Sequence, residues 1–445
     1  MKKKENTPHY PHLLTDGLLV LAGTVFLLYP GTQGYAAIQQ AKVGCFYLLF
    51  GGYLALMLLF TAEMLVTRQI HLPAPKAVWY NMSIAQKGVL LYWLFSLISA
   101  LTSDYFPLTL RGLTRDEGLL TITLYCMTFL CVSFFARPKR WLLDAFAAAM
   151  TAFSAICLLQ LAGFNPLHLY PDGTNYFGAG IDYAGEYLGT VGNADLTAAV
   201  LCMAFALLAV AAWKGKETRR VLYAIVSALC LAALLLSRVR AGILAVVVGA
   251  VLFAPLLATT KKRRRLLLVC DGALVLLVIL AVSTATGGTL YELRCLLHGD
   301  VQDDFGSGRI YIWRQVLSLV PQHLWFGTGP DTMAAASILW GGSYQDKLGG
   351  TLNIMIDTAH NEYLGILYHQ GIFALLAYLA ALADILRRLV RRRDDAVCAA
   401  LGTAVVGYLI QAFFGFSMCA SAGLFWLLLG LLENGLSREQ QEVRK

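Results

Sequence analysis

The sequence predicts an all-α protein that crosses a membrane about twelve times and forms one transmembrane domain over residues 1–445. Hydrophobic residues make up 58% of the chain, and the mean hydropathy is +0.63. Charged residues make up only 14%, against about 25% in soluble domains. In addition, the basic residues collect in alternate connections between long apolar segments. This pattern excludes an ordinary soluble enzyme and a disordered chain.

A membrane-spanning helix needs about 20 mostly apolar residues. Twelve segments satisfy this length, at roughly 13–30, 43–64, 86–103, 118–136, 141–163, 194–213, 221–237, 241–259, 266–284, 358–386, 396–414 and 418–435. The polar stretch from Met1 to His12 precedes further spans and no cleavage site, so we expect the first segment to be retained. Most of the ten cysteines lie in apolar segments without regular spacing, and we interpret them as small core residues.

The distribution of Lys and Arg sets the expected orientation, because these residues accumulate in cytoplasmic connections. If the amino terminus is cytoplasmic, every inner connection is basic, as residues 137–140, 214–220, 261–265 and 387–393 illustrate. We therefore expect both termini in the cytoplasm. The net charge of +8 then follows from topology and anionic membrane lipids, and no nucleic-acid partner is needed.

Two outer connections are long, which is typical of functional loops. The first covers residues 164–193, and the second covers residues 285–357, between the ninth and tenth spans. Within the second loop, apolar residues recur at helical spacing over 310–320. This spacing predicts a short helix that opens at Ser307 and is interrupted at Pro321. Its apolar face is expected to lie on the membrane surface or to close over a site.

Arg238 and Arg240 are the only charges in a forty-residue apolar segment, Val221 to Thr260. Both ends of this segment are expected in the cytoplasm, so it must cross and return, with the two arginines at the outer turn. One interpretation is a pair of interfacial side chains that reach lipid phosphates. We favour an anion site, because two guanidinium groups one residue apart repel each other unless an anion lies between them.

His360 lies where the tenth span begins. Counting back about 20 residues from Leu386 places it on the order of 10 Å outside the hydrocarbon, in the same outer layer as Arg240. If Asp357 or Thr358 caps the helix, His360 lies in its first turn, where the helix dipole favours neutral imidazole, the base form. The alternative is a histidine that bonds only to its own loop.

Arg309 follows the glycine-rich stretch 305–308 at the start of the predicted loop helix. A surface arginine is the ordinary interpretation of this position. A glycine-rich stretch alone is a weak phosphate signal, and the arginine is what makes this loop a candidate phosphate site.

Several motifs together resemble the O-antigen ligase and O-antigen polymerase superfamily. They are His360-Asn361-Glu362-Tyr363-Leu364 with Gly371 and Ile372, Arg240-Ala241-Gly242, Ser307-Gly308-Arg309 with Trp313, Phe326-Gly327-Thr328-Gly329-Pro330 and Gly192-Asn193-Ala194-Asp195. The motifs occur in the family's order and cover roughly residues 180–435. The first five spans are supported by hydrophobicity alone.

The resemblance implies a membrane glycosyltransferase of cell-surface polysaccharide assembly. Such an enzyme moves a glycan from undecaprenyl pyrophosphate to an acceptor hydroxyl at the outer face of the bacterial cytoplasmic membrane. Its partners would be this donor, a glycan or glycolipid acceptor and membrane lipids. The resemblance implies that His360 is the catalytic base and that Arg240 and Arg309 bind the pyrophosphate, without a metal or other cofactor.

Further assignments follow from the same resemblance. Arg238 stands where the family is usually uncharged, and we include it among the pyrophosphate-binding candidates. Asn193, Asp195 and Asn361 are candidates for orienting the acceptor, with a helix N-cap as the alternative role for Asn193. A single displacement with pyrophosphate as the leaving group would invert the anomeric centre.

A polytopic transporter of a small solute or glycolipid is the main alternative, because twelve spans with both termini inside is also a common transporter layout. The candidate residues cluster at one face, whereas a transporter needs a path to both sides. A non-catalytic membrane scaffold is a third interpretation. Within the glycosyltransferase class, the sequence leaves ligase and polymerase open.

Overall fold

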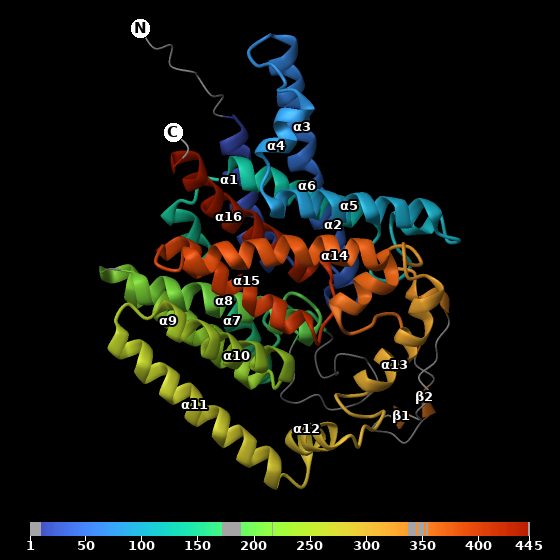
Figure 1. Ribbon diagram of the computed structural model, residues 1–445, viewed down its shortest axis with the longest axis vertical. Helices are drawn as coiled ribbons and strands as arrows, with labels where there is room; N and C mark the ends of the chain where they lie inside the picture. The colour runs from blue at the N-terminus through green and yellow to red at the C-terminus, as the bar shows by residue number, and fades with distance from the viewer. Residues whose placement is uncertain are drawn as a thin grey trace.

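The computed structural model describes residues 10–170, 188–215, 217–336, 344–345, 351–352 and 355–443, which form an almost entirely helical bundle (Figure 1). The helices are α1 (Tyr10–Leu21), α2 (Ile38–Phe46), α3 (Gly52–Val66), α4 (Pro75–Asn81), α5 (Ile84–Thr102), α6 (Leu119–Phe135), α7 (Arg140–Leu161), α8 (Ala194–Lys214), α9 (Glu217–Leu236), α10 (Arg240–Leu257), α11 (Lys261–Thr284), α12 (Gly288–His298), α13 (Arg309–Leu319), α14 (Glu362–Arg391), α15 (Ala396–Ala412) and α16 (Cys419–Val443).

Short elements complete the fold. Two π-helical turns, Ala22–Phe26 and Tyr47–Gly51, extend α1 and join α2 to α3. The 3-10 turns are Gly34–Ala37, Leu108–Leu110, Val320–Gln322 and Met333–Ala336. The antiparallel strands β1 (Tyr344–Gln345) and β2 (Thr351–Leu352) have two residues each.

Each of the twelve predicted spans coincides with a helix in the described residues. Nine helical stretches among these residues are long and apolar enough to cross a membrane, consistent with a polytopic membrane protein. Helices α6 and α15 are shorter, with 17 residues each, and α1 has 12 residues before its π-helical extension. The count of twelve spans and the orientation of the termini therefore stay predictions.

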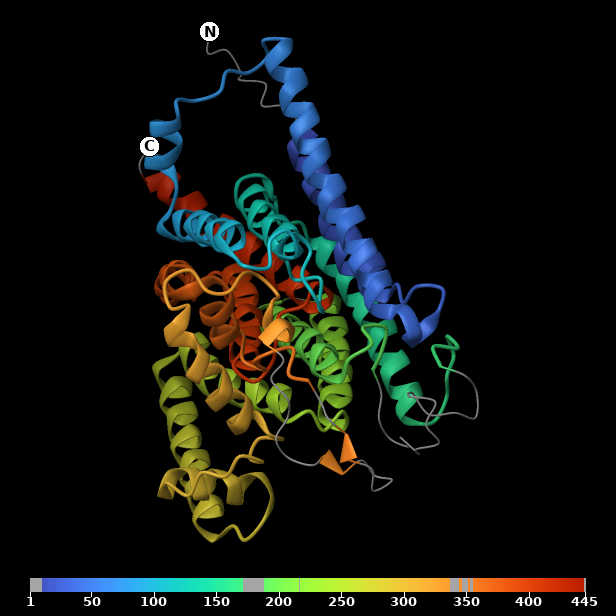
Figure 2. The same cartoon turned by 90° about the vertical axis from the view of Figure 1, so that its right-hand side faces the viewer.

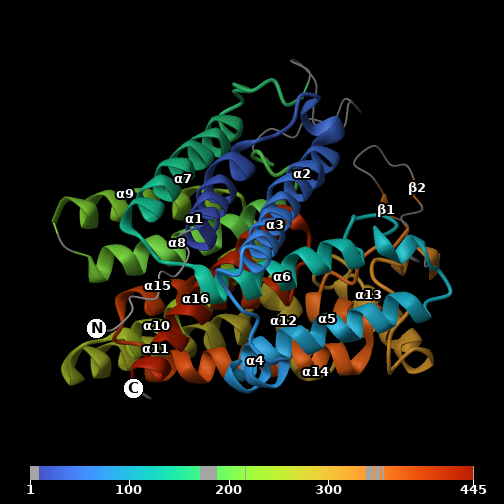
Figure 3. The ribbon, with the colours of Figure 1, turned by 90° about the horizontal axis from the view of Figure 1, so that it is seen from above.

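The core of the bundle is formed where α5, α6, α14 and α16 meet. Helix α5 runs alongside α14, and α16 packs against α6 (Figures 1 and 3). Gly88 allows the close approach of α5, because a Cβ atom there would lie 2.9 Å from the carbonyl oxygen of Ala377. Trp426 of α16 stacks with Tyr92 and Tyr125, at centroid distances of 6.2 and 6.0 Å. These three rings line the cavity described below.

Other helices lie outside this core. Helices α2 and α3 continue each other as one long helix beside α1 (Figure 2). Helix α11 lies at the periphery (Figure 1), and only 6% of the residues in its most apolar 18-residue stretch are buried. An ionic cluster joins α14 to α16: Arg388 pairs with Asp384 at 2.8 Å and with Glu433, and all three side chains are buried.

The segment between α11 and α14 contains two helices in its described part. Helix α13 begins at Arg309, two residues after the predicted opening at Ser307, and a 3-10 turn at Val320–Gln322 contains Pro321. The second helix, α12, is not predicted from the sequence. It ends at His298, and Gly299 in the left-handed conformation caps it. Parts of the two long connections, 171–187 and most of 337–354, lie outside the described residues.

Candidate active site

His360 immediately precedes α14 and does not lie in its first turn. The side chain of Asn361 accepts a hydrogen bond from the Leu364 N–H at 3.0 Å and is the N-cap of the helix. Capping by Asp357 or Thr358 was expected and is wrong. His360 has a φ of +45°, which an α-helix cannot contain, so the helix begins after it.

The imidazole of His360 is held in a partly buried, electropositive environment. Its ring contacts Phe416 edge to face at a centroid distance of 5.4 Å. The Nδ1 atom is buried and has no hydrogen-bond partner in the described part of the chain. Burial lowers the pKa of His360 from 6.5 to about 4, and the positive charges of Arg309 and Arg115 contribute in the same direction. His360 is therefore neutral at pH 7 and can accept a proton.

Arg309 is anchored by three contacts. Its Nη1 donates to the carbonyl of Gly306 at 2.9 Å, and its Nε donates to the carbonyl of Phe414 at 3.0 Å. The Nη2 atom lies 3.4 Å from a carboxylate oxygen of Asp195 on α8. The side chain of Arg309 is 19% exposed. Its contacts link the start of α13 to α8 and to the connection between α15 and α16.

Arg240 lies at the rim of this arrangement. It opens α10, is 60% exposed, and its Nη1 lies 3.7 Å from Glu292 of α12. The other carboxylate oxygen of Glu292 accepts the N–H of Gly306 at 3.0 Å. Arg240 is thus connected to the Gly306–Arg309 turn through one carboxylate.

Arg238 does not share this connection. It lies in the turn between α9 and α10 with a φ of +58°, and its side chain is exposed. The charge of Arg309 lowers the pKa of His360, and the carboxylate of Glu292 contacts both Arg240 and the turn before Arg309. Arg238 forms no ion pair with any described residue.

The three acceptor candidates have structural partners. Asn193 is the N-cap of α8, and its side chain accepts the Leu196 N–H at 3.1 Å. Asn361 has the same role for α14. Asp195 is the counter-ion of Arg309. Their assignment to acceptor orientation stays a prediction.

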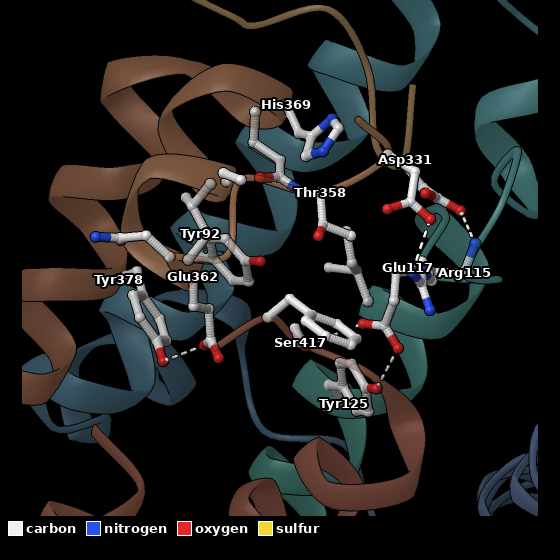
Figure 4. Close-up of a pocket in the computed structure, with 18 of the residues that line it drawn as sticks. Tyr92, Arg115, Glu117, Tyr125, Asp331, Thr358, Glu362, His369, Tyr378 and Ser417 are labelled. Atoms are coloured by element: carbon white, nitrogen blue, oxygen red, sulfur yellow. Dashed lines mark hydrogen bonds and ion pairs between the residues drawn. The ribbon is translucent and has the colours of Figure 1, made fainter. Parts of the chain in front are cut away.

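A cavity of about 90 Å³ lies beside His360, between α5, α6, α14 and α16. Its lining includes Tyr92, Arg115, Glu117, Thr358, Glu362 and Phe416. Thr358 lies between Glu362 on one side and Glu117 and Arg115 on the other (Figure 4). His360 is not among the lining residues, but Phe416 lines the cavity and its ring contacts the imidazole.

Arg115 was not predicted as a site residue. It forms an ion pair with Asp357 at 2.8 Å, and its guanidinium lies 4.9 Å from the centroid of Phe416. Its Nε atom is buried without a partner in the described residues. Asp331 fixes the loop by accepting the backbone N–H groups of Thr114 and Arg115 at 3.1 and 2.9 Å. Arg115 and His360 thus both contact the ring of Phe416.

Glu117 was also missed. Its carboxyl accepts hydrogen bonds from Tyr125 at 2.8 Å and from Ser417 at 3.0 Å. Burial raises the pKa of Glu117 to about 8, although both hydrogen bonds act in the opposite direction. A signal was present in the sequence, since five charged residues, Asp104, Arg111, Arg115, Asp116 and Glu117, crowd the short connection between the third and fourth predicted spans.

Comparison with known proteins finds a family match over part of the chain. Residues 225–379, from within α9 to within α14, match the family model described as O-antigen ligase. This part of the chain is therefore similar to the O-antigen ligase family. The match confirms the resemblance to the O-antigen ligase and polymerase superfamily. A search of curated proteins finds no match to the chain.

The matched segment contains Arg238, Arg240, Arg309 and His360. The matched residues do not include Asn193 and Asp195, nor do they include the loops that carry Arg115, Glu117 and Phe416. The candidate site is therefore completed by parts of the chain outside the domain match. Within the described residues, no group of three or more His, Cys, Asp or Glu side chains is arranged to hold a metal ion.

Proposed function

We propose that this protein transfers a glycan from undecaprenyl pyrophosphate to an acceptor hydroxyl at the outer face of the bacterial cytoplasmic membrane. The match to the O-antigen ligase family supports glycan transfer of the ligase or polymerase type in polysaccharide assembly. The observation that carries the finer proposal is the imidazole of His360, whose pKa is lowered by burial and by the positive charges of Arg309 and Arg115. A neutral base next to cations suits proton removal beside an anionic leaving group.

The proposed reaction is a single displacement. His360 accepts the proton of the acceptor hydroxyl on a ring nitrogen, and the oxygen forms a bond to the anomeric carbon of the donor. The bond between that carbon and the pyrophosphate oxygen breaks, and undecaprenyl pyrophosphate departs with the electron pair. The anomeric configuration inverts. Pyrophosphate leaves as a stable anion, so the reaction needs neither a general acid nor a metal.

Arg309 and Arg240 stabilise the negative charge that grows on the departing pyrophosphate. Their present ion pairs are long, at 3.4 Å to Asp195 and 3.7 Å to Glu292. Bidentate hydrogen bonds from guanidinium to phosphate oxygens are shorter and stronger than such contacts. A pyrophosphate can therefore replace these carboxylates as the partner of the two arginines.

The experiment that tests the proposal is transfer by the purified full-length protein in lipid vesicles. The donor is an undecaprenyl-pyrophosphate-linked glycan, and the product is separated from the donor by chromatography. His360→Ala is expected to lower the rate about 10²- to 10⁴-fold, which is the usual cost of losing a general base. His298→Ala, at the exposed end of α12, is the matched control and should retain activity. Near-normal turnover of His360→Ala would remove the histidine from the mechanism.

Ligase and polymerase activity differ only in the acceptor. Deleting the gene and comparing lipid-linked glycans with surface polymer separates the two. Single-unit carrier glycans without long chains would indicate a polymerase. Accumulated long chains on the carrier would indicate a ligase.

A further inference from the structure

Helix α14 is interrupted at Gly371, which has a φ of +82° and a ψ of 179°. This backbone conformation is open essentially only to glycine. In a continuous helix the N–H of Ile372 would bond to the carbonyl of Tyr368. It bonds instead to the carbonyl of Leu324, at 2.8 Å. The first part of α14, residues 362–370, is therefore separated from the rest by a break.

A loop of residues 323–329 fills this break. The N–H of Thr328 donates to the carbonyl of Tyr368 at 3.0 Å, and the N–H of Gly329 donates to the carbonyl of His369 at 2.9 Å. Irregular backbone is tolerated at membrane depth only where its polar groups are paired within the protein. The loop and the break pair each other in this way.

The break lies within the thickness of the membrane. Gly371 precedes Leu386, the expected inner end of the span, by about 15 residues, which corresponds to about 23 Å of helix. The hydrocarbon core of a bilayer is about 30 Å thick. A tilt of the helix would place Gly371 still farther from the outer surface. The loop thus enters from the outer face to a depth at which lipid surrounds the protein.

The loop presents an aromatic surface at this depth. The ring of Trp325 stacks on Phe373 at a centroid distance of 5.6 Å, and Phe373 stacks on Phe95 of α5 at 5.5 Å. Both phenylalanines belong to helices that are long and apolar enough to span. Trp325 is 60% exposed, and so is 55% of Leu376, one turn after Phe373. This uncharged surface suits acyl chains.

The indole N–H of Trp325 forms no hydrogen bond with the described part of the chain. Tryptophan is enriched where a membrane meets water, because its ring is apolar and its N–H can bond to polar groups at the lipid interface. Lipid is therefore the partner that suits both the ring and its N–H.

The same loop is connected to the segment that carries His360. A small hydrophobic cluster, separate from the core of the bundle, contains Ile312 and Val316 of α13 together with Ala359 and Tyr368. His360 follows Ala359 directly and belongs to this unit. The loop 323–329 joins the unit to the part of α14 that lies deeper in the membrane.

We propose that residues 323–329 form a re-entrant loop that contacts outer-leaflet lipid through Trp325 and holds the segment carrying His360 in position. The lipid contact is independent of the reaction. The positioning of His360 rests on the glycosyltransferase function proposed above. Trp325 and Gly371 are positioning residues in this arrangement, because they act through the placement of the histidine.

The lipid contact is tested by fluorescence of the full-length protein in nanodiscs. The nanodiscs contain either plain phosphatidylcholine or phosphatidylcholine with brominated acyl chains, which quench tryptophans that they contact. The emission of the wild type minus that of Trp325→Phe is the contribution of Trp325. We expect most of this contribution to be lost in brominated lipid, with a greater loss when the bromine atoms lie near the headgroup.

Trp426→Phe is the matched control, since the side chain of Trp426 is only 4% exposed and its contribution should survive in brominated lipid. Emission from Trp325 that survives brominated lipid and is quenched by acrylamide in the water would overturn the inference, because the ring would then face solvent. Survival in both quenchers would also overturn it, because the ring would then be covered by protein.

The positioning role is tested by Gly371→Ala in the transfer assay. A Cβ atom at this position would lie 2.3 Å from the carbonyl oxygen of Trp325, so the loop must move out of the break. Because a misplacement of about 1 Å can cost about 10²-fold, we expect a loss of transfer of that order. The acid-side fall of kcat/KM should also move to higher pH, because the imidazole of His360 loses part of the burial that lowers its pKa.

The control is Gly272→Ala on α11, where an added Cβ atom would meet no other atom within 4 Å. It should behave as the wild type. If Gly371→Ala does not accumulate in the membrane, a second pair of variants decides. Trp325→Ala should lower transfer, and Trp325→Phe, which keeps an aromatic ring against Phe373, should restore it.

The outcomes separate this inference from the proposed function. Wild-type transfer and pH dependence in both Gly371→Ala and Trp325→Ala would refute the positioning role and preserve the transferase. A wild-type protein that transfers no glycan would refute the proposed function and, with it, the positioning role. The quenching experiment decides the lipid contact in either case.

Discussion

The lowered pKa of His360 predicts an unusual tolerance of acid. With a pKa of about 4, roughly 90% of the imidazole is neutral at pH 5, whereas with the ordinary value of 6.5 only about 3% would be neutral. The amount of base available at pH 5 therefore differs about 30-fold between the two cases. We expect kcat/KM for transfer to change little between pH 7 and pH 5 and to fall only as the pH approaches 4.

The assay is transfer in lipid vesicles over this pH range, because the pH dependence of kcat/KM reports groups of the free enzyme. Arg115→Gln removes one of the positive charges that lower the pKa of His360, so the acid limb should move to higher pH. Arg115→Lys keeps the charge and should keep the limb in place. The acid-side fall of kcat should occur at a higher pH than the acid-side fall of kcat/KM. The reason is that the negative charge of a bound pyrophosphate raises the pKa of the imidazole.

A decline of about 25-fold in the kcat/KM of the wild type between pH 7 and pH 5 would refute this reasoning, because it would indicate an unshifted histidine. An acid limb that is identical in Arg115→Gln and wild type would show that the charge of Arg115 does not act on His360.

Further variants test the remaining assignments. Arg309→Ala should lower transfer about 10²- to 10³-fold without loss of the protein from the membrane, and wild-type turnover would exclude the arginine from leaving-group stabilisation. Arg240→Ala should abolish detectable transfer, while Arg238→Ala should have a smaller effect in the same assay; equal losses would mean that the two arginines are assigned wrongly. Arg388→Met leaves the buried carboxylate of Glu433 without its cation and should destabilise the fold by about 3–5 kcal/mol, measured as a lower midpoint of thermal unfolding in detergent.

Much of the helical fold could be predicted from the sequence, because hydropathy is a local property of each segment. A helix occupies each predicted span, and the outer-loop helix begins within two residues of its predicted opening at Ser307. The π-helical turns and the short first helix were not predicted. They depend on how neighbouring helices pack and not on composition, which is why the number of spanning helices is harder to predict than their positions.

The candidate site was predictable only in part. His360, Arg309 and Arg240 belong to short motifs that can be read along the chain. The contribution of Arg115 depends on an ion pair with Asp357, and these two residues are far apart in the sequence. No local pattern encodes such a contact.

The helix cap illustrates a subtler limit. Asp357, Thr358 and Asn361 are all residue types that cap helices. The left-handed backbone of His360 decides between them, and the sequence does not show that conformation.

The carboxylates beside the two outer arginines have a consequence for selectivity. Arg309 faces Asp195 and Arg240 faces Glu292, so each cation already has an internal anion. Any incoming anion must exchange with these carboxylates. A singly charged ion such as chloride gains little from that exchange, whereas a phosphate can form two parallel hydrogen bonds to a guanidinium. In the proposed function, the built-in counter-ions therefore favour a diphosphate over simple salts.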